Sequence, residues 1–224
     1  MTKVIITGAT GMLGKAVLQE CIEHPKIDKV LIINRNPLGL NHPKLEEIIL
    51  KDFSDIQSIE EQLKGYDACF FCMGVSAVGM DEEKYTNITY VTTKAFADVL
   101  YAVNNNMVFN YISGAGTDTS EMGKVMWARV KGKTENYILQ KGFKKAYMFR
   151  PGIIIPEKGT KSRTGWLNAT YTLMSPLFPM LKKLSSVTTS TNIGLAMINS
   201  LYFNADTNYL SNTDINTLAN KKSE

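Results

Sequence analysis

The sequence has 224 residues, of which 44% are hydrophobic and 21% charged, and its net charge is +4. This length and composition fit one globular domain with a sizeable core. Lysines and arginines are scattered along the chain, which argues against the clustered basic face of a nucleic-acid-binding protein. No apolar run reaches the roughly 18 residues of a membrane span, and the first strand lies too near the N-terminus for a signal peptide to precede it. We therefore expect a cytoplasmic protein that binds neither nucleic acid nor membrane.

The chain opens on a strand, a glycine-rich turn and a helix. Residues 3–7 form a short β-branched run typical of a buried strand, and residues 15–23 carry apolar side chains at helical spacing. Between them stands the pattern G-x-x-G-x-x-G. Gly8 permits the sharp turn, Gly11 lets the backbone approach a phosphate, and Gly14 lets the helix pack closely. This unit is expected to bind the pyrophosphate of a dinucleotide at the helix N-terminus.

Strands and helices then alternate along the chain. Five more apolar runs predict buried strands at residues 29–34, 45–50, 68–72, 107–112 and 146–149. Apolar periodicity predicts helices at residues 56–63, 82–104, 125–141 and 193–203, with Ser54 or Asp55 capping the first and Gly142 ending the third. The alternation predicts an α/β fold, a doubly wound parallel sheet of the Rossmann type with helices on both faces.

The sequence becomes less regular beyond residue 155. We expect residues 1–155 to form the nucleotide-binding core, and residues 156–224 to add a small C-terminal cap on the substrate side and a closing helix of the same domain. Large apolar residues and two prolines mark residues 160–184, which predict either a lid over a pocket or the interface of a homodimer. From Leu218 onward the polar sequence predicts a frayed end.

The cysteines and histidines predict no metal site. Cys69 and Cys72 form a C-x-x-C pattern inside an expected strand, where residues three apart point to opposite faces, so we expect buried free thiols. The two histidines, His24 and His42, stand in loop-like sequence, which argues against a zinc site or a hydrolase triad.

These features together resemble the short-chain dehydrogenase/reductase superfamily. The most similar branch is the atypical, extended one, whose members include NAD(P)-binding Tat-interacting-protein-like and epimerase-like proteins. The resemblance covers residues 1–155 and is carried, in the family's order, by Thr7 to Gly14, Asp52-Phe53, Ser113, Lys131 with Glu135, and Arg150-Pro151-Gly152.

The resemblance implies how a dinucleotide would lie. It places the pyrophosphate on Thr10, Gly11, Met12 and Leu13, the adenine on Asp52 and Phe53, its ribose on Met73 and Gly74, and the nicotinamide amide near Pro151 and Gly152. Two alternatives stay open. Asp52 could instead be a loop or helix-capping carboxylate, and Arg150 could serve only to fix its own turn.

Arg35 bears on the choice between the two nicotinamide dinucleotides. An acid after the second strand would accept the adenosine ribose hydroxyls and repel a 2′-phosphate. The chain has Asn34-Arg35-Asn36 there, and a guanidinium pairs with phosphate through two hydrogen bonds and full charge. This favours NADP(H), with NAD(H) possible. Arg35 could instead stack on the adenine or be a surface residue without a ligand. In either case the preference between NADP(H) and NAD(H) stays open.

The chain departs from the family at the expected active-site helix. Family oxidoreductases carry Tyr-x-x-x-Lys there and a Ser at the end of the preceding strand, and the Tyr exchanges the carbonyl proton. Here Ser113 and Lys131 are the candidate catalytic residues, and Lys131 would also hold the nicotinamide ribose. Ser113 could instead be a strand-end hydroxyl that only satisfies local backbone. Trp127 stands at the Tyr position. An indole N–H donates hydrogen bonds but is too weak an acid to deliver a proton.

Other tyrosines offer no clear substitute by sequence. Tyr137 is expected to face away from Lys131 on the same helix, and Tyr111 to lie deeper in the core. The sequence does not place Tyr85.

Three functions follow from this reading. The first is a reductase that passes hydride from NADPH to a flavin-, quinone- or carbonyl-type acceptor without the usual Tyr. The second is a dinucleotide-binding sensor or regulator that does no chemistry. The third, ranked last because it needs the missing Tyr, is a nucleotide-sugar epimerase or dehydratase.

Overall fold

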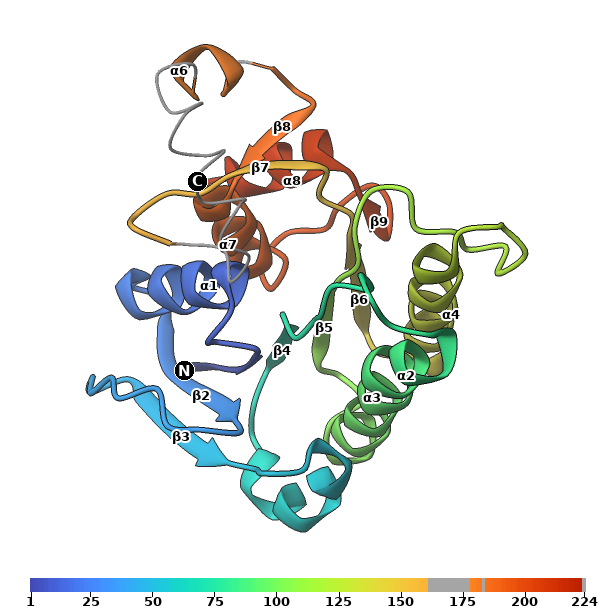
Figure 1. The fold of residues 1–224 in the computed structure, drawn as a ribbon. Coiled ribbons are helices and arrows are strands. Elements are labelled where there is room, and N and C mark those ends of the chain that lie inside the picture. Colours follow the sequence, from blue (N-terminus) through green and yellow to red (C-terminus); the bar gives the residue numbers. More distant parts are fainter. Residues whose placement is uncertain (161–177, 183, 223–224) are drawn as a thin grey trace.

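The computed structural model describes residues 1–160, 178–182 and 184–222, and its centre is a parallel sheet with helices on both faces (Figure 1). In this part of the chain the main sheet has seven strands, in the spatial order β3-β2-β1-β4-β5-β6-β9. They are β1 (Thr2–Thr7), β2 (Ile27–Asn34), β3 (Leu45–Ile49), β4 (Ala68–Phe71), β5 (Val108–Ile112), β6 (Lys145–Phe149) and β9 (Tyr209–Leu210). All neighbours pair in parallel, and the strand order reverses between β1 and β4. The predicted doubly wound fold is confirmed.

Helices cover both faces of the sheet. One face carries α1 (Met12–Glu23) and α7 (Ser190–Asn199), which pack side by side (Figure 1). The other face carries the 3-10 helix η1 (Phe53–Leu63), α3 (Thr92–Val103) and α4 (Met126–Lys141). A short helix, α2 (Glu82–Thr86), and a π-helical turn, η2 (Asn87–Val91), lead directly into α3.

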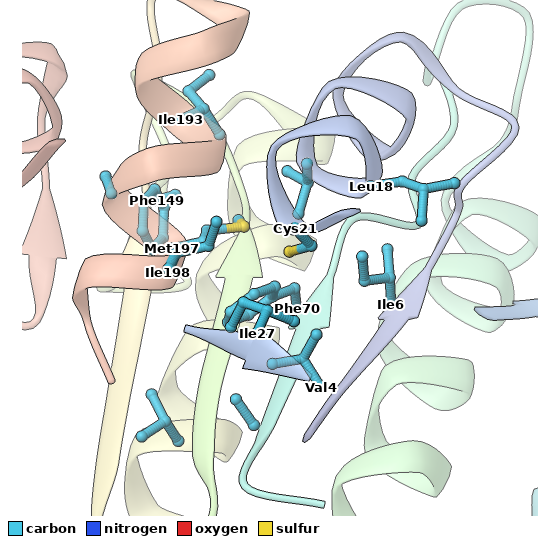
Figure 2. Close-up of a cluster of buried hydrophobic side chains, with 14 of the residues drawn as sticks. Val4, Ile6, Leu18, Cys21, Ile27, Phe70, Phe149, Ile193, Met197 and Ile198 are labelled. Carbon is cyan, nitrogen blue, oxygen red and sulfur yellow. The ribbon is translucent and has the colours of Figure 1, made fainter. Parts of the chain in front are cut away.

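Each face of the sheet has its own apolar core. Figure 2 shows the first, in which Ile6 and Phe70 of the sheet meet Cys21 of α1 and Met197 of α7. Because both faces are covered, successive residues of a strand are buried, which explains the continuous apolar runs in the sequence. Cys69 belongs to the second core and Cys72 packs against the first, so the two thiols lie on opposite faces as expected.

Two predicted helices differ in detail. The helix expected at 56–63 is a 3-10 helix that begins at Phe53, and its cap is Asp52, whose carboxylate accepts a hydrogen bond from the Ser54 N–H at 2.9 Å. The prediction of Ser54 or Asp55 as the cap is therefore wrong. The helix expected at 82–104 contains the π turn η2, which apolar spacing alone could not reveal. Gly142 does end α4, in the left-handed conformation with φ +92°.

The C-terminal residues contribute more than the sequence predicted. Strand β9 extends the main sheet, and α8 (Asn212–Ala219) follows it, capped by Ser211 and Asp214 in a reciprocal pair of hydrogen bonds. Leu218 is buried, so the expectation of a frayed end from that residue is wrong. The helix expected at 193–203 runs instead from Ser190 to Asn199, because the Thr189 side chain caps it earlier.

A second, smaller parallel pair consists of β7 (Ile153–Ile155) and β8 (Val187–Thr189), with the short α6 (Phe178–Leu181) before β8. Residues 161–177 and 183, on which the lid-or-interface prediction mostly rests, lie outside the described residues. Among the helices that are described, none has both the length and the apolar character of a membrane span.

Candidate dinucleotide and active-site clefts

The glycine turn between β1 and α1 leaves no room for a side chain at Gly8 or Gly14. A Cβ on Gly8, whose φ is +71°, would lie 2.8 Å from backbone atoms of Cys72 and Met73 beyond β4. A Cβ on Gly14 would lie 2.1 Å from the Gly8 carbonyl oxygen. The turn is thus wedged between the start of α1 and the end of β4, at the point where the strand order reverses. Ligands of such sheets bind at this point.

The start of α1 presents its backbone N–H groups. Gly11 is the N-cap, and in this described helix neither a side-chain cap nor an acidic residue covers the first turn. Met12 and Leu13 form that turn, and the Leu13 side chain packs against the first core. Unpaired N–H groups and the helix dipole favour a bound anion there. The geometry therefore fits the pyrophosphate that the motif predicts.

A cleft of about 340 Å³ opens beside this turn. Gly8, Thr10 and Gly11 line one side, and the remaining walls come from residues after β2, β3 and β4: Asn34, Arg35, Asn36, Lys51, Asp52, Phe53, Cys72, Met73, Gly74 and Val75, with Ile88 and Thr92. This cleft contains every residue predicted to hold the adenosine half. The prediction that they share one site thus agrees with the geometry.

Asp52 and Phe53 have structural partners as well as cleft positions. Hydrogen bonds from Ser54 lower the pKa of the exposed Asp52 carboxyl, which is therefore ionised at neutral pH. The Phe53 ring packs edge-on against Phe96 at 5.7 Å, and the Arg35 guanidinium lies 5.7 Å from the centre of the same ring. Asp52 is thus both a helix cap and a cleft residue.

A second cleft, of about 440 Å³, lies at the ends of β4, β5 and β6. Its lining combines predicted site residues with others: Val75, Ser76, Ala77, Val78, Tyr85, Ser113, Gly114, Ala115, Trp127, Lys131, Pro151 and Gly152. Val75 lines both clefts, which therefore meet at the segment that follows β4. A dinucleotide lying along this edge would extend from the first cleft into the second.

Ser113 and Lys131 meet in the second cleft through the protein backbone. The Lys131 ammonium donates to the Ser113 carbonyl, and the Ser113 hydroxyl donates to the Phe149 carbonyl at 3.1 Å. Burial lowers the pKa of Lys131 to about 8, and the nearby Glu135 carboxylate opposes that shift. Lys131 is thus charged at neutral pH but close to its titration range.

Trp127, which stands where the resemblance implies Tyr, lines the second cleft. Its indole is partly exposed, and a Cβ on Gly116 would lie 3.6 Å from its ring. Tyr137 donates its hydroxyl to Asp98, away from Lys131, and Tyr111 is buried in the second core, both as expected. Tyr85, which the sequence could not place, does line the cleft.

A buried ion pair supports the turn after β6. The Arg150 guanidinium donates two hydrogen bonds to the Glu135 carboxylate of α4, whose side chain is 0% exposed. Arg150 also lies 4.4 Å from the Tyr209 ring centre. The Asn212 carboxamide of α8 accepts from the Gly152 N–H at 3.1 Å. The alternative that Arg150 fixes its own turn therefore agrees with its contacts.

Comparison with known proteins bears on what this edge binds. The model of a family described as NAD(P)H-binding matches residues 8–170 of the chain, well over half of its length. The chain belongs to this NAD(P)H-binding family. It is 28% identical to protein HTATIP2 of Rattus norvegicus over 169 residues, which are 73% of this chain and 67% of the rat protein.

Solved structures confirm the fold of this NAD(P)H-binding protein. The Bordetella bronchiseptica enzyme WbmH, in complex with NAD⁺, superposes with a TM-score of 0.65 at 16% identity, covering 90% of this chain and 72% of that one. The ADP-L-glycero-D-manno-heptose-6-epimerase of Helicobacter pylori gives 0.68 at 14% identity, covering 97% and 81%. These likenesses confirm the fold that the resemblance to atypical, epimerase-like short-chain dehydrogenases/reductases implied. Among the described residues, no group of three or more His, Cys, Asp or Glu side chains could hold a metal ion.

Proposed function

We propose that the protein is an oxidoreductase that binds NADPH and passes a hydride to a planar acceptor of the flavin or quinone type, and less readily to simple carbonyls. The observation that carries this proposal is the meeting of the two clefts at Val75. That junction puts the glycine turn, Ser113 and Lys131 along one edge of the sheet.

The chain's own residues have distinct tasks in this proposal. The N–H groups at the start of α1 bind the diphosphate, and Arg35 and Lys51 supply positive charge near the adenosine end. Lys131 holds the nicotinamide ribose through its ammonium group, and the Pro151-Gly152 backbone orients the nicotinamide amide. Bound NADPH would supply a hydride at the second cleft. Trp127 offers a flat apolar wall there but no acidic proton.

Acceptors with weakly basic reduced forms suit this site best. A simple ketone becomes an alkoxide on hydride transfer and needs a proton from a positioned acid, whereas reduced flavins and quinones carry their negative charge more readily. NADPH oxidation by the purified protein, followed at its absorbance band, tests this with a panel of flavins, quinones and aldehydes. We expect turnover with at least one flavin or quinone. Tight NADPH binding without turnover on any acceptor would contradict the proposal.

A non-catalytic dinucleotide sensor is the second candidate. Two observations favour it: Trp127 replaces the proton-donating Tyr, and the Ser113 hydroxyl and Lys131 ammonium both donate to backbone carbonyls. Binding without turnover in the same assay is the result expected of a sensor.

Arg35→Ala should weaken NADPH binding and leave NADH binding nearly unchanged. Removing a charged side chain that donates hydrogen bonds to a phosphate weakens binding by about 1.5–3 kcal/mol. The dissociation constant then rises about 10- to 100-fold. Fluorescence titration with both nucleotides measures the two constants. Lys51 lines the same cleft, so the NADPH dissociation constant of Lys51→Ala shows whether loss of any positive charge there has the same effect. Equal losses for NADPH and NADH in Arg35→Ala would mean that Arg35 stacks on the adenine instead.

The dissociation constant for NADPH should rise with pH. Lys131 is protonated below its pKa of about 8 and loses its charge above it, so its attraction for the nucleotide falls as pH increases. The bound anion favours the charged form, which moves the effect to somewhat higher pH. Titrations between about pH 6.5 and about pH 9.5 should show a dissociation constant that is flat below about pH 8 and rises above it, by up to about tenfold per pH unit. In Lys131→Met the dependence should vanish, and its persistence there would assign it to another group.

Trp127→Tyr should create or raise carbonyl reductase activity. The substitution places a phenol one helical turn before Lys131 and restores the family's arrangement. A positioned general acid contributes about 10²- to 10⁴-fold. NADPH-dependent aldehyde reduction is the assay, and Trp127→Phe is the matched control that provides a ring without the hydroxyl. If Trp127→Tyr bound NADPH but stayed inactive, the rest of the site would not be arranged for carbonyl reduction.

A further inference from the structure

The walls of the second cleft carry little charge. Among the described residues that line it, Lys131 is the one with a charged side chain. The first cleft differs, because Arg35, Lys51 and Asp52 all line it. A charged group on the acceptor would therefore meet only the Lys131 ammonium, which donates to the Ser113 carbonyl and which the proposed function assigns to the nicotinamide ribose. These walls suit an acceptor without a charged group.

The hydroxyl groups of the lining already have partners in the protein. The Ser113 hydroxyl donates to a backbone carbonyl of β6 at 3.1 Å, and the Ser76 hydroxyl accepts from the Val78 N–H at 3.3 Å. The Tyr85 hydroxyl has the Thr89 side chain as its hydrogen-bond partner. A hydroxyl-rich acceptor would lose its bonds to water in this cleft and regain few of them from these side chains.

Val78 presents an apolar side chain at the opening of the cleft. It is the second residue of a tight turn over residues 77–80, which the Met80 N–H closes by donating to the Ala77 carbonyl at 3.1 Å. Gly79 follows with φ +76°, as the third residue of a type II turn does. The turn fixes the place of the Val78 side chain, which is 90% exposed and yet lines the cleft.

Trp127 supplies a second apolar surface from another element. A single exposed valine is ordinary on a protein surface. Val78, however, shares a cleft with the partly exposed indole of Trp127, which comes from α4. Apolar surface in a cleft lowers the free energy when a ligand removes it from water. The two side chains therefore favour a ligand with an apolar body.

The two acceptor classes of the proposed function differ in these respects. Flavins carry a hydroxyl-rich ribityl chain, and flavin nucleotides carry phosphate as well, whereas a quinone can have neither. We propose that the acceptor is an uncharged quinone with an apolar side chain, and that Val78 is a specificity-determining residue that packs against that side chain. This inference rests on the proposed function and narrows its class of acceptor.

The reduction needs no acid from the protein. The quinone gains a hydride with both of its electrons from the bound nucleotide, and the resulting hydroquinone anion takes one proton from water. Each turnover converts one NADPH, one quinone and one solvent proton into one NADP⁺ and one hydroquinone. The positive charge of Lys131 in the same cleft favours the anion until the proton arrives.

A panel of acceptors on the wild-type protein tests the acceptor class. It pairs naphthoquinones that carry either an alkyl side chain or a sulfonate group, and it adds riboflavin and flavin mononucleotide. NADPH oxidation gives kcat/KM for each acceptor. We expect the alkyl quinone to exceed the sulfonated quinone and both flavins by about tenfold or more, because apolar contacts in a cleft discriminate on this scale.

Val78→Asp and Val78→Lys test the residue, and its exposed position spares the fold. In Val78→Asp we expect kcat/KM for the alkyl quinone to fall about tenfold or more. The NADPH dissociation constant should stay unchanged, because Val78 does not line the first cleft. Val78→Lys should raise kcat/KM for the sulfonated quinone relative to the alkyl one. A merely structural role of Val78 would not make the preference follow the sign of the charge.

Met122→Asp is the matched control. Met122 is 86% exposed and lines neither cleft, so the same added charge there should leave the preference among quinones unchanged. A wild-type kcat/KM for the alkyl quinone no higher than for the sulfonated one, or an unchanged preference in Val78→Asp, would overturn this inference and leave the proposed function standing. NADPH binding without turnover of any acceptor would overturn the proposed function itself, and this inference with it.

Discussion

Gly14→Ala is expected to weaken dinucleotide binding at least about 100-fold and to destabilise the protein. The added Cβ would lie 2.1 Å from the Gly8 carbonyl oxygen, 2.6 Å from the Gly8 carbonyl carbon and 2.9 Å from the Ala9 nitrogen. All three are backbone atoms, so no flexible side chain can yield. Either α1 or the turn must shift, and the N–H groups at the start of the helix then lose their alignment toward a diphosphate.

The magnitude follows from two opposing effects. Overpacking of this kind costs typically about 1–3 kcal/mol and occasionally more, whereas Ala in place of Gly favours a helix by about 1 kcal/mol. The direct overlap with backbone atoms outweighs the helix preference of Ala, so we expect the free energy of unfolding to fall by about 2 kcal/mol. Urea unfolding measures the stability, and NADPH titration should show at least about 100-fold weaker binding.

Gly74→Ala provides the control for this prediction. A Cβ on Gly74 meets nothing within 4 Å, so the substitution should leave the urea midpoint unchanged even though Gly74 lines the first cleft. Wild-type NADPH affinity in Gly14→Ala would show that the turn is a structural bend without a role in binding.

Glu135→Gln should cost about 3 kcal/mol of unfolding free energy, near the lower end of the range for breaking one half of a buried ion pair. Glu135 is the fully buried partner, while the Arg150 side chain is 22% exposed and keeps some contact with water. Glutamine has the same shape, but it leaves the guanidinium without its countercharge. Because Arg150 holds the turn before Gly152, NADPH binding should weaken as well.

Glu82→Gln is the matched control for this second prediction. It breaks the ion pair between Glu82 and Arg129, in which the Glu82 side chain is 53% exposed, and such pairs contribute about 1 kcal/mol or less. Urea unfolding of both variants gives the comparison. A loss below about 1 kcal/mol in Glu135→Gln would mean that water solvates Arg150 as well as Glu135 does.

Much of the nucleotide-binding half could be predicted from the sequence because its signals are local. The glycine spacing after β1 has a steric reason at each position, and the structure shows the close contacts at Gly8 and Gly14. The apolar runs reveal the strands because both faces of the sheet are covered. Residues at strand ends, such as Arg35 and Ser113, then lie on one edge by topology alone.

The parts that could not be predicted depend on contacts distant in sequence. Strand β9 has two residues, too few for a periodic signal, and it forms because its neighbour β6 offers an open edge. Helix α8 is polar overall, and only its packing against α7 shows that Leu218 is buried. Tyr85 lines the second cleft from the short helix α2, and apolar spacing reveals neither that helix nor the π turn after it.

The last strand also ties the site to the completion of the chain. The Arg150 N–H donates to the Leu210 carbonyl at 2.8 Å, and the Tyr209 ring lies against the guanidinium of the same arginine. During synthesis these partners emerge about sixty residues after Arg150, so the corner beside Pro151 and Gly152 assembles late. Proteolytic trimming or a premature stop before Tyr209 would therefore remove a brace of the corner beside Pro151 and Gly152 rather than a dispensable appendage.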